Sequence, residues 1–270
     1  MRWLLFRGLA REQRHYHEFP RMFERATGHA TAALDLPGFG TENARRSPWS
    51  VRGIVDDVRS RFLRSRGEGP WGIFGISLGG MVALDWAARF PDDFARLVVV
   101  NSSAGDLSPP WHRFAPGTFV RLPRFLAAFS ALARERAILR LISNRSAALN
   151  EPIARDWASY ALDRPPSRTS FARQLVAGAT SRMRPGIAAP VLVLASKADR
   201  LVSWRCSERL ATTLGAPLEL HDTGGHDLTL DAPDWICARV AAWLGAASGT
   251  GGDPVSNSWE ESASGAPRSS

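Results

Sequence analysis

Short apolar segments alternate with longer amphipathic ones over the first hundred residues of this chain. The apolar segments are residues 3–6, 31–34, 71–75 and 97–100. Each is short and apolar throughout, as expected of a strand that is buried on both faces. The longer segments, in which apolar residues return at helical spacing, are residues 11–26, 51–64 and 77–90. This order predicts an α/β fold: a doubly wound, mostly parallel sheet with helices on both faces.

The alternation stops after the fourth apolar segment. Residues 106–184 lack apolar strands and contain helical stretches near 125–141 and 155–162. The strand and helix pattern then resumes, with segments at 191–194, 218–220 and 232–244. The middle part therefore reads as an insertion into the α/β pattern.

These patterns predict a division of the chain into three parts. Residues 1–104 and 187–246 are expected to form the α/β core, and residues 105–186 a helical cap. Residues 247–270 are rich in Gly, Ser, Ala and Pro. Such a composition offers few core-forming side chains, so we expect a disordered tail there.

The composition allows a sizeable core, since 44% of the residues are hydrophobic. No run approaches the roughly 18 apolar residues of a membrane span, and the first residues turn polar too soon for a signal peptide. The two cysteines, Cys206 and Cys237, imply no disulfide framework. We therefore expect a cytoplasmic protein that does not enter a membrane.

The net charge of +8 raises the question of nucleic-acid binding. The arginines are spread along the whole chain, however, and Lys197 is the one lysine. No run of basic residues with interleaved aromatics appears, and no His, Cys, Asp or Glu spacing suggests a metal site. We expect a small-molecule substrate, no nucleic-acid partner and no cofactor.

The motif with chemical content is Gly75-Ile76-Ser77-Leu78-Gly79. It follows a predicted strand and opens a predicted helix, which is the context that a G-x-S-x-G nucleophile elbow requires. A serine on that sharp turn exposes its hydroxyl, and the free N–H groups of the helix N-terminus favour a developing oxyanion. Ser77 is therefore the candidate nucleophile.

A serine hydroxyl needs a base, and in this arrangement the acid and then the histidine follow the nucleophile along the chain. His226 lies in the loop between the last strand and the last helix, whereas His221 reads as a strand-end residue. Asp199 follows the strand at 191–194, at the sheet edge where ligands bind. Asp222 is expected to meet solvent, and Asp227 to diverge from its neighbour His226.

Together these motifs resemble the α/β-hydrolase superfamily. The stretch Asp35-Leu36-Pro37-Gly38-Phe39-Gly40 matches the D-x-P-G-x-G of this group, and Leu78-Gly79-Gly80-Met81 extends the elbow as in its members. The resemblance implies an oxyanion hole formed by the backbone N–H groups of Leu9 and Leu78. Many members have His-Gly where this chain has Arg7-Gly8, so Arg7 is expected either to support the loop or to contact an anionic substrate.

The resemblance implies a serine hydrolase that cleaves a small ester or related acyl substrate through an acyl-enzyme. Phe114, Phe119, Phe125, Phe129 and Trp157 of the cap are candidates for an apolar acyl pocket, or simply for helix packing.

Two alternatives remain open. Members with a similar motif pattern act as lyases in menaquinone biosynthesis and use the triad for proton abstraction. Cap arginines such as Arg121, Arg124 and Arg173 would suit their anionic substrate. The other alternative is a binding protein that keeps the fold without the chemistry.

Overall fold

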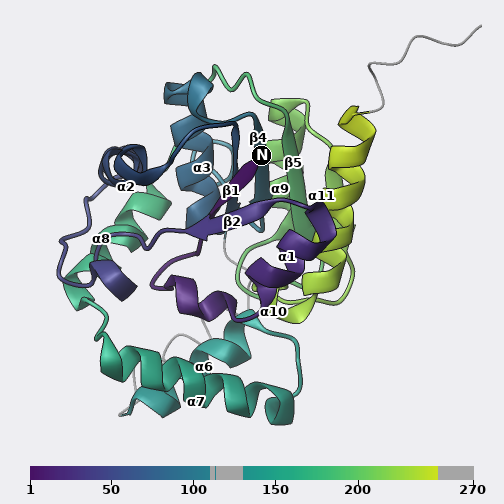
Figure 1. Cartoon of the computed structure of the whole chain (residues 1–270). Helices are drawn as coiled ribbons and strands as arrows, with labels where there is room; N and C mark the ends of the chain where they lie inside the picture. Colours follow the sequence, from purple (N-terminus) through teal and green to yellow (C-terminus); the bar gives the residue numbers. More distant parts are fainter. Residues whose placement is uncertain (110–112, 114–129, 249–270) are drawn as a thin grey trace, which may run out of the picture.

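The computed structural model describes residues 1–109, 113 and 130–248 of the chain (Figure 1). The predicted aromatic lining at Phe114, Phe119, Phe125 and Phe129, and the arginines Arg121 and Arg124, lie outside the described residues. So do residues 249–270 of the predicted tail, whereas its first two residues, 247 and 248, end the last helix, Pro233–Ser248. Within the described residues, no helix is long and apolar enough to span a membrane.

A single sheet forms the centre of the described chain, and its strand order is β2-β1-β3-β4-β5-β6. The strands are β1 (Arg2–Phe6), β2 (Ala30–Ala33), β3 (Trp71–Ile76), β4 (Arg96–Val100), β5 (Val191–Ser196) and β6 (Leu218–His221). Every pair of neighbours runs parallel. The predicted α/β fold is confirmed, and the sheet is parallel throughout rather than mostly parallel.

Helices cover both faces of this sheet, as the apolar strands require. One apolar cluster joins the sheet to α2 (Val51–Ser65), α3 (Leu78–Arg89) and α9 (Trp204–Leu214). The other joins it to α1 (Phe19–Thr27) and α11 (Pro233–Ser248), which pack side by side (Figure 1). Trp3 and Leu4 face opposite clusters although they are neighbours, and both are fully buried.

The prediction of one helix over residues 11–26 is wrong in one respect. The chain forms a short 3-10 helix, η1 (Gln13–Tyr16), and then turns before α1 begins at Phe19. His17 between them has a positive φ of 49°, which ends any helix. The break puts His15 and His17 on the surface that receives the inserted helices.

Three helices of the insertion lie between β4 and β5 in the described chain. They are α6 (Ala131–Ile142), α7 (Ala147–Asp163) and α8 (Arg168–Ala179). A serine hydroxyl caps the N-terminus of each, from Ser130, Ser146 and Ser167. Helix α7 begins earlier than predicted and continues through Pro152, and α8 and α9 were not predicted. The remaining short helices are η2 (Gly40–Glu42), η3 (Pro91–Asp93) and α10 (Leu228–Asp231).

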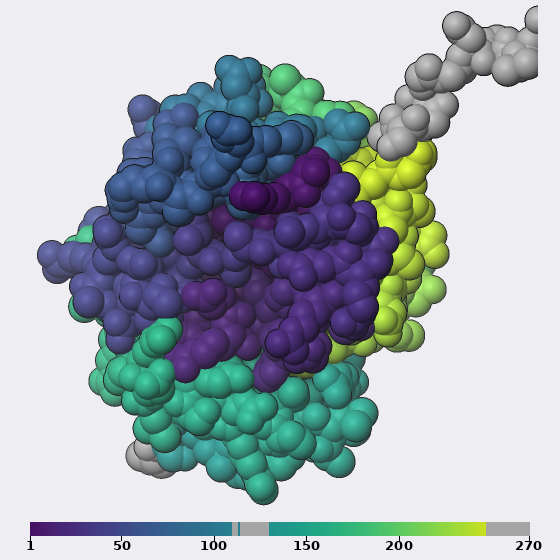
Figure 2. All heavy atoms as spheres, viewed as in Figure 1, coloured from purple at the N-terminus to yellow at the C-terminus, as the bar shows by residue number. Residues whose placement is uncertain are grey.

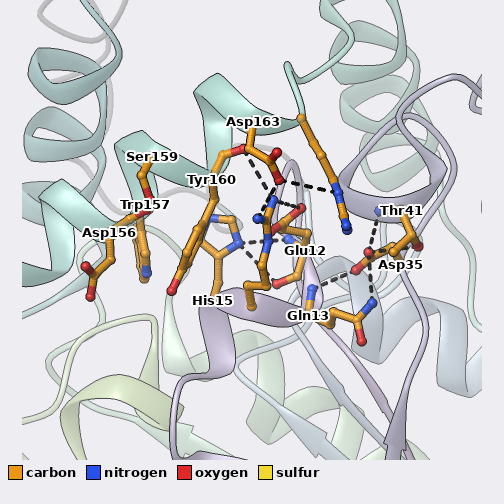
Figure 3. Close-up of polar contacts among 12 residues, drawn as sticks. Glu12, Gln13, His15, Asp35, Thr41, Asp156, Trp157, Ser159, Tyr160 and Asp163 are labelled. Atoms are coloured by element: carbon orange, nitrogen blue, oxygen red, sulfur yellow. Dashed lines mark hydrogen bonds and ion pairs between the residues drawn. The ribbon is translucent and has the colours of Figure 1, made fainter.

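The inserted helices pack against the N-terminal segment (Figure 2), and α7 contacts it through polar and aromatic groups (Figure 3). Arg14 pairs with Asp163 at 2.8 Å, and the Trp157 indole N–H donates to His17 Nε2 at 2.8 Å. The His15 ring meets the Trp157 ring edge-on at 4.8 Å, and Trp157 is fully buried. Trp157 therefore serves packing and not the acyl pocket.

Protonation of the buried His15 and the half-buried His17 should weaken this contact. Burial holds the pKa of His17 below its ordinary value, and the pKa of His15 lies well below its own because of burial and the charges of Arg11 and Arg7. The unfolded chain therefore takes up protons near pH 6.5, where the folded chain does not. The stability that these groups contribute is present above about pH 6.5 and falls as the pH drops below it.

We therefore expect the melting temperature of the wild type to fall between pH 7.5 and 5.5. His17→Gln keeps an acceptor for Trp157 but cannot take up a proton, so its melting temperature should fall less over the same interval. Equal losses in the two proteins would show that His17 has no part in the pH dependence.

Candidate active site

Ser77 lies on the sharp turn between β3 and α3. Its backbone has φ 55° and ψ −118°, a strained conformation for a residue with a side chain. The turn brings backbone against backbone: a Cβ added to Gly75 would overlap the Gly79 carbonyl, and one added to Gly79 would lie 2.5 Å from the Phe6 carbonyl oxygen. The two glycines of the motif are therefore required by close packing.

Two backbone N–H groups next to Ser77 have no hydrogen-bond partner within the described part of the chain. Leu78 is the first residue of α3, where N–H groups point out of the helix. Leu9 lies in a turn closed by the bond from Arg11 N to Gly8 O, at 3.2 Å. A Cβ on Gly8 would lie 3.1 Å from the Ser77 Cβ, so this turn touches the elbow.

His226 and Asp199 are in direct contact. The carboxylate of Asp199 can only accept, so His226 Nδ1 donates to its Oδ2 at 2.7 Å. The other oxygen of Asp199 accepts from the backbone N–H groups of Leu201 and Val202, at 2.7 and 2.9 Å. Both side chains are buried. The imidazole is thus fixed in the tautomer that leaves Nε2 free to accept a proton.

Asn101 joins the strand that follows the nucleophile to the histidine loop. The Ser77 N–H donates to Val100 O at 2.9 Å, and the next residue, Asn101, donates from Nδ2 to His226 O at 2.8 Å. Asn101 also donates to Gly225 O and accepts from Ser196 N. The described residues contain no hydrogen bond between the Ser77 hydroxyl and His226, so the structure brings these two residues to one sheet edge without a direct contact.

The other carboxylates near His226 have different partners. Asp222 is exposed and pairs with Lys197 at 2.8 Å, as its strand-end position predicted. Asp227 points to Arg7, with oxygen-to-nitrogen distances of 2.5 and 3.1 Å. His221 Nδ1 accepts from Gly224 N, so His221 is the satisfied strand-end residue that the sequence indicated. Within the described residues, no group of three or more metal-binding side chains is assembled.

Gln174 connects the inserted helix α8 to the loops beside Ser77. Its side chain is buried, accepts from Ala10 N at 3.3 Å and donates to Pro37 O at 3.2 Å. Gln174 thereby holds both the turn that carries Leu9 and the D-L-P-G-F-G loop. Sequence reasoning missed this residue because nothing in its local pattern separates it from an exposed glutamine.

A cavity of about 140 Å³ lies between α2, α3 and the end of α8. Its lining includes Met81, Asp85, Ala104 and Thr180, but neither Ser77 nor His226. We therefore do not assign it to the substrate. Arg173, a candidate for binding an anion, donates to Ser47 O at 3.1 Å and stacks over the Trp49 ring.

A sequence model described as the alpha/beta hydrolase fold matches residues 4–233, which is most of the chain. The chain belongs to the α/β-hydrolase fold family. This chain is 28% identical over 218 residues to a putative carbamate hydrolase RutD of Serratia proteamaculans, covering 76% of this chain and 78% of that protein.

Two solved structures show the same fold. The meta-cleavage product hydrolase of Pseudomonas fluorescens superposes with a TM-score of 0.73 at 19% identity, covering 92% of this chain and 91% of the other. The enol-lactonase of Burkholderia xenovorans gives a TM-score of 0.71 at 19% identity, covering 90% and 91%. At such identities the likeness concerns the fold alone.

Asn101→Ala should destabilise this α/β-hydrolase. The change leaves Ser196 N and the carbonyls of Gly225 and His226 without partners, which costs about 3 kcal/mol of unfolding free energy in a buried site. Ser102→Ala is the control, because it removes one hydrogen bond, to Ser77 O, and should cost about 1 kcal/mol. Urea denaturation of both proteins measures the difference, and equal midpoints would contradict the role given to Asn101.

Proposed function

We propose that this protein is a serine hydrolase that cleaves a small ester or related acyl substrate through an acyl-enzyme. In this proposal Ser77 is the nucleophile, His226 the general base and Asp199 the residue that orients His226. The backbone N–H groups of Leu9 and Leu78 form the oxyanion hole. Helices α6 to α8 belong to a cap over the α/β core.

The observation that carries the proposal is the fixed imidazole of His226 at the sheet edge where Ser77 sits on its strained turn. The 2.7 Å bond to Asp199 selects the tautomer that general-base catalysis needs. The two unpaired N–H groups beside Ser77 add a place for a developing negative charge. The missing contact between Ser77 and His226 agrees with this role, since such bonds often tighten only when substrate is bound.

The mechanism then follows from these groups. Ser77 Oγ attacks the carbonyl carbon while His226 Nε2 takes its proton, and the N–H groups of Leu9 and Leu78 hold the oxyanion. The intermediate collapses, the leaving alcohol takes the proton from His226, and the acyl group stays on Ser77. Water repeats the attack with His226 as base, which releases the acid and restores Ser77.

The related hydrolases support acyl chemistry but not one substrate. The relative in Serratia proteamaculans is named a putative carbamate hydrolase, so we include carbamates beside esters among the candidate substrates. No described contact favours the lyase alternative, because the guanidinium of Arg173 is already held by Ser47 and Trp49. A panel of p-nitrophenyl esters of graded acyl length is the first test of the proposal.

Ser77→Ala should reduce ester turnover by about a thousandfold or more, as for other members of such triads. The fold should be unchanged, because only a hydroxyl is removed and its backbone bond to Val100 O remains. The measurement is initial rates across the ester panel, with the circular dichroism spectrum and melting temperature as controls. Comparable hydrolysis by both proteins would refute the assignment and leave a binding protein as the better reading.

Asp199→Asn should lower turnover by up to about ten-thousandfold, the loss seen for the matching change in a serine protease. The amide is nearly isosteric, but it can offer its N–H to Nδ1 and so favour the wrong tautomer. Asp222→Asn is the matched control, since Asp222 pairs with Lys197 on the surface and should leave turnover within about twofold of the wild type. Near-normal rates for Asp199→Asn on the same ester would exclude Asp199 as the third member.

A further inference from the structure

A buried ion pair lies directly behind the proposed active site. Arg7 donates from its two terminal nitrogens to the two carboxylate oxygens of Asp227, at 3.1 and 2.5 Å. Arg7 also donates to the Thr229 hydroxyl at 2.8 Å, and its guanidinium lies 4.9 Å from the centre of the Tyr16 ring. The side chains are 4% and 2% exposed, so both charges have left water.

The pair joins the two loops that carry the proposed chemistry. Arg7 follows β1 and precedes Gly8, which touches Ser77, and Leu9, which offers its N–H. Asp227 follows His226 and is the N-cap residue of the short helix α10. These loops are about 220 residues apart in the sequence, and no other described side-chain bond joins residues 7–9 to residues 226–229.

The charges of the pair depend on each other. Burial alone would raise the pKa of Asp227, but the Arg7 guanidinium holds it below its ordinary value, and a hydrogen bond from Thr229 and the His226 ring act in the same direction. Burial acts against the charge of Arg7, and Asp227 outweighs it and raises the Arg7 pKa. Removing one partner would therefore leave an uncompensated charge next to His226.

We propose that Arg7 and Asp227 are positioning residues of the active site. Their ion pair fixes the loop of His226 against the loop of Leu9, and it neutralises the carboxylate that adjoins the base. The inference rests on the proposed function, because it assigns the pair to the same base and oxyanion hole. It also accounts for an arginine where many members of the family have a histidine.

The charged groups around the His226 loop determine whether a variant should make the His226 ring easier or harder to protonate. They include Asp199 on the ring itself, the Arg7–Asp227 pair, Asp231, which accepts from Gly225 N at 2.7 Å, and Arg200, which donates to Ser143 O at the end of α6. The N-terminal segment adds His15 and His17, whose charges interact with that of Arg7. Arg7→Gln removes one positive charge and leaves the Asp227 carboxylate, which favours the imidazolium. Asp227→Asn leaves the positive charge of Arg7, which disfavours the imidazolium form of His226.

The test is a titration of the His226 ring by NMR, which needs no substrate. The midpoint should move to higher pH in Arg7→Gln and to lower pH in Asp227→Asn, by about one pH unit in each. The double variant carries neither charge, so its midpoint should return close to that of the wild type. It also avoids the unpaired buried charge that could prevent either single variant from folding.

A second readout separates positioning from charge. A fluorophosphonate reacts with a base-activated serine, and its rate of attachment to Ser77 at the high-pH plateau reports the geometry of the site. The double variant should label about tenfold more slowly than the wild type, because the two loops are no longer locked together. Arg7→Lys keeps the charge but loses the bidentate fork, so we expect an intermediate labelling rate and an unshifted midpoint.

Arg59→Gln is the matched control. Arg59 also pairs with a buried aspartate, Asp93, at 2.6 Å, and also stacks on an aromatic ring, Phe90, but it lies beside the helix η3 that precedes β4, away from the His226 loop. The Arg59→Gln variant should have a lower melting temperature, but the same His226 titration midpoint and the same plateau labelling rate as the wild type.

These experiments distinguish failure of the positioning role from failure of the proposed hydrolase function. Midpoints that do not move in Arg7→Gln and Asp227→Asn, or a double variant that labels as fast as the wild type, would overturn the positioning role. Absence of labelling at Ser77 in the wild type would instead refute the proposed hydrolase, whatever the midpoints show.

Discussion

In a parallel sheet every strand ends at the same edge, and the site of this protein is built from that constraint. β1, β3, β4 and β5 are neighbours with parallel pairing throughout. Arg7, Ser77 and Asn101 directly follow β1, β3 and β4, and Asp199 lies three residues after the end of β5. Segments far apart in the sequence are thereby brought together by the backbone hydrogen bonds of the core, before any side chain at the edge makes a contact.

Buried donors and acceptors at this edge must form hydrogen bonds with one another, because water does not reach them. Asn101 uses both ends of its amide, on Ser196 N and on the carbonyls of residues 225 and 226. Asp199 accepts from two backbone N–H groups as well as from His226. An unpaired buried group costs more than a hydrogen bond gains, so each of these bonds constrains the others. The N–H groups of Leu9 and Leu78, which have no partner among the described residues, are exceptions at this edge.

Of the inserted helices, α8 shares the main apolar cluster with α2 and α3 through the buried Ala177. Helices α6 and α7 form a small apolar cluster around Leu139 and Trp157. Their contacts with the N-terminal segment include the buried pair of Arg11 and Glu135, at 2.7 Å, and the bond from Trp157 to His17. An interface held by ion pairs and histidines is more sensitive to pH than an apolar one.

The six strands of the sheet could be predicted from the sequence, because six short, mostly apolar runs alternate with amphipathic segments. It also singled out Ser77, through its glycines, and proposed His226 and Asp199 through chain order. The three-dimensional structure was needed to show that Asp199 touches His226 and that Asp227 pairs with Arg7, because neither contact is encoded in local spacing. The roles of His17, Asn101 and Gln174 were likewise hidden, because the partners of these polar side chains lie 125 to 164 residues away in the sequence.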